Sequence, residues 1–255
     1  MSTAGLTQRV DDGVATLTLD RPPVNALSVG LCVAMRQAFQ ALSDDPAVTC
    51  VVLAGAGTRA FCAGLDFRDF VGGEAGDPAA TETLVREMYE AVHGCMRPVV
   101  AAIDGPAIGA GALLAAVCDV RIATARASFV LPEINLGRIG GGAHLGRLLP
   151  QGVLRRLVFT GDALPASEAF RVGLVDEIVD GDVVEAARRM AATISAKGRL
   201  AASWAKRALN DVEGVPFGEG YRTEQRLNAE YRQTFDAQEA ARAWVEKRQP
   251  HFKGW

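Results

Sequence analysis

The sequence predicts an α/β fold that ends in a helical region, and three observations lead to this prediction. In the first half of the chain, short apolar runs bounded by glycine or proline alternate with segments whose apolar residues recur every three or four positions. Beyond Leu200, nearly every segment has the helical spacing. The 255 residues, of which 49 % are hydrophobic, suffice to bury a core without disulfides or a metal.

The N-terminal elements follow from turn and cap signals. Asp11-Asp12-Gly13 predicts a hairpin turn, and Val14–Leu19 alternates as a strand does. Pro22 and Pro23 end this strand because proline cannot donate to a sheet. Ser28 is expected to cap a helix, and residues 49–53 form a β-branched run that predicts a buried strand. The apolar face of that helix consists of Leu31, Met35, Ala38, Phe39 and Leu42.

The rest of the chain is predicted to continue this alternation before it becomes helical. The small-residue stretch over residues 72–80 is expected to be mobile. The expected elements are helices over residues 84–95 and 112–117 and strands over Val99–Ile103, residues 118–123, Ser128–Val130 and residues 175–179.

Composition and motifs exclude several classes of function. A net charge of −3 without a Lys/Arg-rich block indicates neither a nucleic-acid nor a membrane-surface partner. The chain has no apolar run of about 18 residues and no signal-peptide pattern, and its five cysteines form no C-x-x-C pair. Its three histidines are scattered, and it has no phosphate-binding P-loop or G-x-S-x-G motif. We therefore expect a cytoplasmic protein without a metal site.

Two glycine-rich segments are candidates for ligand binding. They read Phe61-Cys62-Ala63-Gly64-Leu65-Asp66-Phe67 and Gly105-Pro106-Ala107-Ile108-Gly109-Ala110-Gly111-Ala112. The second leads from a strand into a helix, where unpaired N–H groups carry partial positive charge and suit an anion. Small residues also let a ligand approach the backbone itself. Tight packing of a helix on a sheet would explain the same composition, so both interpretations stay open.

A third segment contains a lone carboxylate. Glu133 lies in Leu131-Pro132-Glu133-Ile134-Asn135-Leu136-Gly137, with no lysine at helical spacing. A carboxylate in apolar surroundings has a raised pKa and is poised to act as a base. The alternative is a solvated loop glutamate.

Together these segments resemble the crotonase (enoyl-CoA hydratase/isomerase) superfamily nearly from end to end. The matching motifs are Arg21-Pro22-Pro23-Val24-Asn25-Ala26-Leu27, the F-C-A-G-x-D loop, A-I-x-G-x-A-x-G-x-G from Ala102 to Gly111, Cys118-Asp119, Pro132-Glu133-x-x-x-Gly137, Thr160-Gly161, and residues 169–175 and 245–254. One such motif alone would be weak support for membership of this superfamily. This many motifs in the same order make the resemblance specific.

The resemblance implies a fold, an assembly and a class of substrate. The fold is a crotonase-like spiral of repeated ββα units, expected over residues 1–199, with a helical oligomerisation region over residues 200–255. The assembly is a homotrimer or a hexamer. The ligand is an acyl-CoA thioester, so coenzyme A is part of the substrate and no separate cofactor is expected.

The resemblance also assigns roles to individual residues. The backbone N–H groups of Leu65 and Ala110 form an oxyanion hole that stabilises a thioester enolate. Lys253 lies near the nucleotide end of coenzyme A, where it supplies a charge for a phosphate, unless it is simply a frayed terminal lysine. The full set of implied substrate-binding residues is Val24, Ala26, Ala63, Gly64, Leu65, Asp66, Phe67, Gly109, Ala110, Leu113, Pro132 and Lys253.

The catalytic acids depart from the usual family pattern. Hydratases of the family carry two glutamates, but here the first position is Leu113 and only Glu133 remains. One carboxylate suffices to move a double bond, because it can take a proton from C2 and return it at C4. Together with P-P-V-N and A-G-L-D, this resembles the Δ3,Δ2-enoyl-CoA isomerases, so isomerase is the leading expectation. A hydratase or dehydratase, and an inert acyl-CoA-binding protein, are the alternatives.

Two residues after Glu133 are unusual for the family. Arg138 and His144 stand where other members often have glycine, threonine or glutamine. They either contact a carboxylate or hydroxyl on the acyl chain or serve helix capping and packing.

Overall fold

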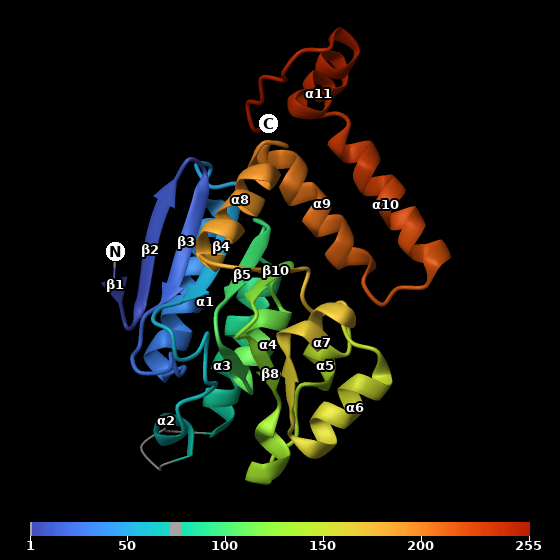
Figure 1. Cartoon of the computed structure of the whole chain (residues 1–255). Helices are drawn as coiled ribbons and strands as arrows, with labels where there is room; N and C mark the ends of the chain where they lie inside the picture. Colours follow the sequence, from blue (N-terminus) through green and yellow to red (C-terminus); the bar gives the residue numbers. More distant parts are fainter. Residues whose placement is uncertain (1, 72–77) are drawn as a thin grey trace.

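A mixed sheet forms the centre of the molecule (Figure 1). The computed structural model describes residues 2–71 and 78–255. Within them, one sheet has the order β1-β2-β3-β4-β5-β7-β10 and a smaller sheet has the order β6-β8-β9. The strands are β1 (Ser2–Thr3), β2 (Leu6–Asp11), β3 (Val14–Leu19), β4 (Cys50–Gly55), β5 (Val99–Ile103), β6 (Pro106–Ile108), β7 (Val120–Thr124), β8 (Ser128–Val130), β9 (Ala163–Pro165) and β10 (Glu177–Val179).

Helices cover both faces of the larger sheet. They are α1 (Val29–Asp44), α2 (Phe67–Val71), α3 (Pro78–His93), α4 (Ala110–Ala116), the 3₁₀-helix η1 (Pro132–Leu136), α5 (Gly142–Leu145), α6 (Gln151–Thr160), α7 (Ala166–Arg171), α8 (Val183–Ser195), α9 (Arg199–Val212), α10 (Phe217–Tyr231) and α11 (Phe235–Glu246). Successive side chains of β4 alternate between two cores, as a strand requires. Val51 and Leu53 join the core with α1, α3 and α4, whereas Val52 joins the core with α8.

The N-terminal predictions are confirmed. Asp12 and Gly13 have φ values of +48° and +77°, the left-handed conformations that a type I′ hairpin turn requires between β2 and β3. Ser28 caps α1, since its Oγ accepts a hydrogen bond from the Leu31 N–H at 3.1 Å. From β3 to β10 the sheet is parallel. The α/β prediction is therefore correct.

Several element boundaries differ from the prediction. Helix α3 ends at His93, α4 begins at Ala110, β7 begins at Val120 and β10 at Glu177. The short strands β6 and β9 were not predicted because each is three residues long and contains a proline. Of the stretch expected to be mobile, residues 72–77 lie outside the described residues and residues 78–80 begin α3.

Helices α9, α10 and α11 form an arm that projects from the sheet (Figure 1). We call residues 199–255 the arm and the described residues before them the body. Polar contacts that join the arm to the body include Lys206 Nζ to Asp119 Oδ2 at 2.7 Å, Arg97 Nη1 to Ser203 Oγ at 2.8 Å and Asn210 Nδ2 to the His93 carbonyl at 3.1 Å. Whether the chain divides into domains at residues 199 and 200 stays a prediction.

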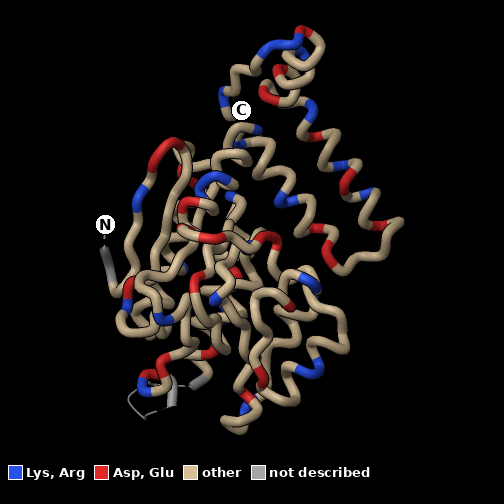
Figure 2. The backbone as a smooth tube through the Cα atoms, in the orientation of Figure 1, with Lys and Arg blue, Asp and Glu red and all other residues tan. Residues whose placement is uncertain are grey.

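The chain after α11 folds back onto that helix. The Lys253 and Gly254 N–H groups donate to the Asp236 carboxylate at 2.6 and 2.8 Å. Along the whole chain, acidic and basic residues are interspersed (Figure 2). Among the described residues, none of the helices combines the length and the apolar character that crossing a membrane requires.

Candidate active site

The two glycine-rich segments lie against each other. Cys62 and Ala107 form a parallel bridge, and the Ile108 N–H donates to the Cys62 carbonyl at 2.9 Å. Gly64 has a φ of +89°, and a Cβ there would lie 2.8 Å from the Ile108 oxygen and 3.4 Å from the Ala110 nitrogen. A Cβ on Gly111 would collide with the Cys62 carbonyl. Glycine therefore permits the close approach of the loop to α4.

This approach leaves two backbone donors free. The Leu27 N–H donates to the Gly64 carbonyl, and the Asp66 N–H donates to the Leu27 carbonyl, so Leu65 is bypassed. Ala110 is the first residue of α4, where an N–H has no acceptor within the helix. In the part of the chain that the structure describes, neither the Leu65 nor the Ala110 N–H donates to another residue. Both can bind an incoming oxygen.

Glu133 lies beside the start of α4. It is the second residue of η1, after Pro132, and a Cβ on Gly109 would lie 2.8 Å from Glu133 Oε1. Gly109 also has a φ of +52°, which disfavours any residue with a side chain. The structure thus places a carboxylate next to the residue that precedes Ala110.

The surroundings of this carboxylate change its acidity. Burial raises the pKa of Glu133 above its ordinary value, and a hydrogen bond from the residue's own N–H only partly offsets this. Its Oε2 is buried and has no hydrogen-bond partner among the described residues. A half-buried carboxyl group whose Oε2 is open is suited to exchange a proton with a bound ligand.

Leu113 adds no acid–base group. It lies one turn along α4 from Ala110 and is 9 % exposed in the apolar core. Its Cδ2 lies 3.5 Å from the position that a Cβ on Gly141 would occupy, at the residue that precedes α5.

A cavity of about 390 Å³ adjoins the first glycine-rich loop. Its lining includes Val24, Ala26, Leu65, Asp66 and Phe67, all of them implied by the resemblance, together with the basic residues Arg21 and Arg68. Arg21 donates to Asp66 Oδ2 at 2.6 Å, and this hydrogen bond holds the pKa of Asp66 below its ordinary value.

A second cavity, of about 480 Å³, also borders Leu65. Its lining includes Val85, Tyr89 and His93 of α3, as well as Arg138 and His144. Leu65 lines both cavities, whereas Glu133 and Ala110 line neither. The two cavities therefore meet at Leu65.

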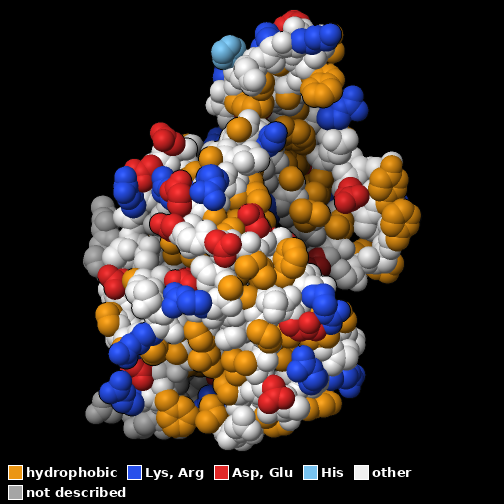
Figure 3. Space-filling model, viewed as in Figure 1, with side chains coloured by type: hydrophobic (Ala, Val, Ile, Leu, Met, Phe, Trp, Pro, Cys, Tyr) orange, Lys and Arg blue, Asp and Glu red, His pale blue; other side chains and the backbone are white. Residues whose placement is uncertain are grey.

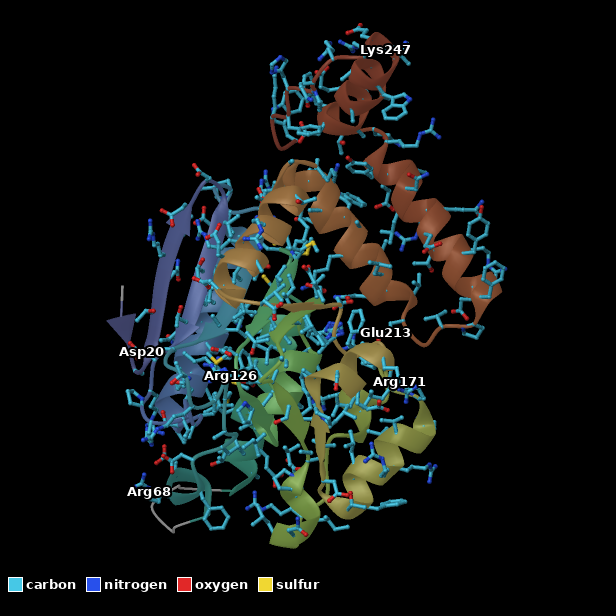
Figure 4. All side chains as sticks on the ribbon, viewed as in Figure 1. Asp20, Arg68, Arg126, Arg171, Glu213 and Lys247 are labelled. Atoms are coloured by element: carbon cyan, nitrogen blue, oxygen red, sulfur yellow. The ribbon has the colours of Figure 1, made fainter. Side chains whose placement is uncertain are left out.

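Sequence reasoning missed Tyr89 and Glu213. The Tyr89 hydroxyl donates to the Ala110 carbonyl at 3.0 Å, and its ring meets the His144 ring edge-on at 4.8 Å between centroids. Glu213, labelled in Figure 4 where α9 ends, pairs with Arg147 and lies 3.6 Å from His93 Nε2. The helical spacing of Tyr89 indicates only a buried residue, so no local signal points to these contacts.

The structure places Lys253 apart from both cavities. Its Nζ lies 4.4 Å from the centre of the Phe235 ring and 5.6 Å from that of Trp255. Contact between Lys253 and a phosphate of coenzyme A stays a prediction. Ala63, Gly64, Gly109 and Pro132 line neither cavity but flank the Leu65, Ala110 and Glu133 positions.

Comparison with known proteins agrees with this fold. The sequence profile of the family described as "Enoyl-CoA hydratase/isomerase" matches residues 9–255. The chain is 32 % identical over 247 residues to the crotonyl-CoA hydratase of Syntrophomonas wolfei, covering 95 % of each chain. It is 33 % identical over 249 residues to the carnitinyl-CoA dehydratase of Salmonella typhimurium, covering 94 % of this chain and 95 % of that relative.

A solved structure shows the same architecture. The enoyl-CoA hydratase of Bacillus anthracis is 32 % identical to this chain and superposes with a TM-score of 0.93, covering 98 % of this chain and all of the other. The chain belongs to the enoyl-CoA hydratase/isomerase family and has the crotonase fold of ββα units followed by C-terminal helices. It is accordingly an enzyme of acyl-CoA thioesters.

Proposed function

We propose that this enzyme adds water to, and removes it from, the C2–C3 bond of a 2-enoyl-CoA thioester. The observation that carries the proposal is the buried Glu133 carboxyl beside Gly109, next to the free N–H groups of Leu65 and Ala110. The names of the relatives, a hydratase and a dehydratase, support it over the isomerase that Leu113 favours.

The two backbone donors stabilise the charge that develops during the reaction. The thioester oxygen accepts hydrogen bonds from the Leu65 and Ala110 N–H groups, and it gains negative charge as the enolate forms. A preorganised donor of this kind contributes about 3–4 kcal/mol to the stability of a transition state. The side chain of Leu65 is incidental to this role, because the amide does the binding.

Glu133 transfers the proton at C2. In the direction of water addition its carboxyl group gives a proton to C2 of the enolate, and in the reverse direction the carboxylate removes it. The raised pKa keeps more of the group protonated near neutral pH than an ordinary glutamate would be.

The two cavities divide the substrate between them. The cavity with Val24, Ala26, Asp66 and Phe67 takes the coenzyme A side, with Arg21 and Arg68 as positive charges near its phosphates. The cavity lined by α3 takes the acyl chain. Leu65 lines both cavities, so the thioester group would lie beside it.

The second candidate function is the shift of a double bond from C3 to C2, which Leu113 specifically favours. It needs one base, and no carboxylate stands at position 113. The test offers straight-chain 2-enoyl- and 3-enoyl-CoA thioesters in ¹⁸O-labelled water. A hydroxyacyl-CoA that carries the label supports the proposal, whereas conversion of the 3-enoyl thioester without label would establish the isomerase.

We also propose that the protein assembles as a homotrimer or a hexamer through the arm. Large apolar side chains on α10 and α11, among them Phe217, Tyr221 and Trp244, are exposed in the single chain. Figure 3 shows hydrophobic side chains gathered over the arm. A surface of this kind is typical of a protein–protein contact.

A further inference from the structure

The cavity assigned to the acyl chain contains a histidine, His144, with an unpaired ring nitrogen among the described residues. His144 lies on α5, a helix of four residues without a side-chain cap. Its Nδ1 is buried and has no hydrogen-bond partner in residues 2–71 and 78–255. A histidine that serves only packing or capping is normally paired when it is buried. The open nitrogen therefore indicates a group that meets a ligand.

His144 is connected to the oxyanion donors by direct contacts. Its ring meets Tyr89 edge-on at 4.8 Å, and the Tyr89 hydroxyl donates to the carbonyl of Ala110 at 3.0 Å. His144 and Leu65 also line the same cavity. The imidazole thus lies on the acyl side of the two N–H groups that would hold the thioester.

His144 also lies close to the position of the missing glutamate. Helix α5 packs against α4. A Cβ on Gly141, the residue that precedes α5, would lie 3.5 Å from Leu113 Cδ2 of α4. The side chain that replaces the first family glutamate is therefore apolar, but the helix packed upon it carries a group that can accept a proton.

The protonation states of the two groups complement each other. Burial, the Arg147 guanidinium and His93 lower the pKa of His144, so its imidazole is neutral near pH 7. Burial raises the pKa of Glu133. Under the proposed function, the lowered pKa suits His144 to accept a proton and the raised pKa suits Glu133 to give one.

The charged groups around His144 are largely compensated. Arg147 pairs with Glu213, and Arg86 pairs with Glu90 at 3.0 Å. Arg138 and Glu82 are the other charged residues that line this cavity, and their opposite charges balance. The cavity therefore provides no excess of negative charge that would keep His144 protonated.

We infer that His144 is the second acid–base residue of this enzyme and does the work of the glutamate that Leu113 replaces. The inference rests on the proposed addition of water. As the water oxygen bonds to C3, one water proton passes to the His144 imidazole and the C2–C3 electron pair moves to form the enolate. Glu133 then gives its proton to C2. Proton exchange with solvent returns the imidazolium and the carboxylate to their starting states, so protons and charge balance.

The test separates the two proton transfers by using two reactions of the full-length protein. Addition of water to straight-chain 2-enoyl-CoA thioesters requires both groups. Exchange of the C2 hydrogens of butanoyl-CoA in deuterated water requires only Glu133 and the backbone donors. In His144→Gln we expect water addition to fall about 10²–10⁴-fold, as for loss of a general base, while exchange stays within a few-fold of wild type. Glu133→Gln should lose both reactions.

His251→Gln is the matched control, because this exposed histidine lies on the arm and should leave both reactions unchanged. Water addition at the wild-type rate by His144→Gln would overturn the role of His144 alone. A parallel loss of both reactions in His144→Gln would show a structural role and also overturn it. Absence of water addition in the wild type, with exchange intact, would instead overturn the proposed function and the role with it.

Discussion

The body and the arm of this protein bury their large side chains to very different extents. In the body, Phe39, Phe61 and Phe129 are at most 1 % exposed. On the arm, Phe217 and Trp244 are each 86 % exposed. The body also exposes apolar residues, among them Ile139 and Phe159, but Phe39, Phe61 and Phe129 lie in the core between the sheet and the helices.

Different interactions hold the two regions. The body is held by apolar side chains on both faces of a parallel sheet, where packing continues from strand to helix. The arm is joined to the body by Lys206 and Ser203, and its end is tied by the carboxylates of Asp236 and Glu239. We propose that the body carries the chemistry, while polar contacts help to hold the arm and its end in position.

The substitution Glu133→Gln is the sharpest test of the proposal that the catalytic residues lie in the body. Gln keeps the shape of the side chain but cannot act as a base, so we expect kcat to fall about 10²–10⁴-fold. Affinity for a CoA thioester, measured by calorimetry, should stay within a few-fold. Glu177→Gln, an exposed change on β10, is the control. A kcat close to wild type in Glu133→Gln would refute the assignment of the base.

Gly109→Ala tests whether the body depends on close packing at the site. The new Cβ would lie 2.8 Å from Glu133 Oε1 and must displace the carboxylate. Because a misplacement of about 1 Å can cost about 10²-fold in rate, we expect a drop of about 10–10²-fold in kcat.

The control for that change is Gly173→Ala. Gly173 also has a positive φ, of +82°, but a Cβ there would meet nothing within 4 Å. Both variants should lose similar stability through backbone strain, while only Gly109→Ala loses activity. Equal activities of the two variants would contradict the position of Glu133.

Lys206→Met tests how the arm is joined to the body. The Lys206 side chain is 4 % exposed and Asp119 is 28 % exposed, so the substitution leaves a partly buried carboxylate without its cation. We expect a loss of about 3 kcal/mol in the free energy of unfolding by urea. Lys197→Met, at an exposed lysine, should change it by less than about 0.5 kcal/mol. Equal stabilities of the two variants would show that the pair does not hold the arm.

Trp244→Ala addresses the exposed face of the arm. Because this ring makes little contact within the chain, the free energy of unfolding should change by less than about 0.5 kcal/mol. If the arm forms the assembly, the sedimentation coefficient at micromolar concentration should fall. Phe159→Ala, an exposed aromatic on the body, should leave it unchanged. A wild-type protein that sediments as a monomer would refute the proposed assembly.

The smallest effect concerns the end of the arm. Arg248 and the His251 N–H lower the pKa of Glu239 from 4.5 to about 2. Because this pKa is lowered by folding, the carboxylate stabilises the fold above pH 4.5 and loses that effect as the pH falls toward about 2. The thermal midpoints of wild type and Glu239→Gln should therefore differ at neutral pH and converge across this range. A difference independent of pH would show that charge is not involved.

Local signals in the sequence were sufficient for much of the body. The Asp12-Gly13 turn, the Ser28 cap and the strands Val14–Leu19 and Val99–Ile103 depend on neighbouring residues, and the structure has them as predicted. The segments that contain Leu65, Ala110 and Glu133 were also recognisable, because glycine and proline mark backbone that must adopt a special conformation. Their roles in catalysis stay predictions.

The expectation of an isomerase shows how little a single residue can say about the reaction that an enzyme catalyses. It depended on Leu113, a residue whose chemistry is plain in the sequence. The sequence cannot show that Leu113 lies beside the residue that precedes α5, the helix that carries His144. The absence of an acid–base side chain at one position therefore does not decide the reaction, because a neighbouring helix can supply another such side chain.

The sequence by itself determined the alternation of strands and helices, the glycine-rich loops and the presence of one carboxylate among apolar residues, because these depend on conformational preferences and on contacts within a few residues. Only the tertiary structure decided which groups meet. Tyr89 reaches Ala110 across 21 residues, and Lys206 reaches Asp119 across 87. The physical reason is that such contacts, and the burial that shifts the pKa values of Glu133 and His144, arise from the packing of whole elements, which no local pattern records.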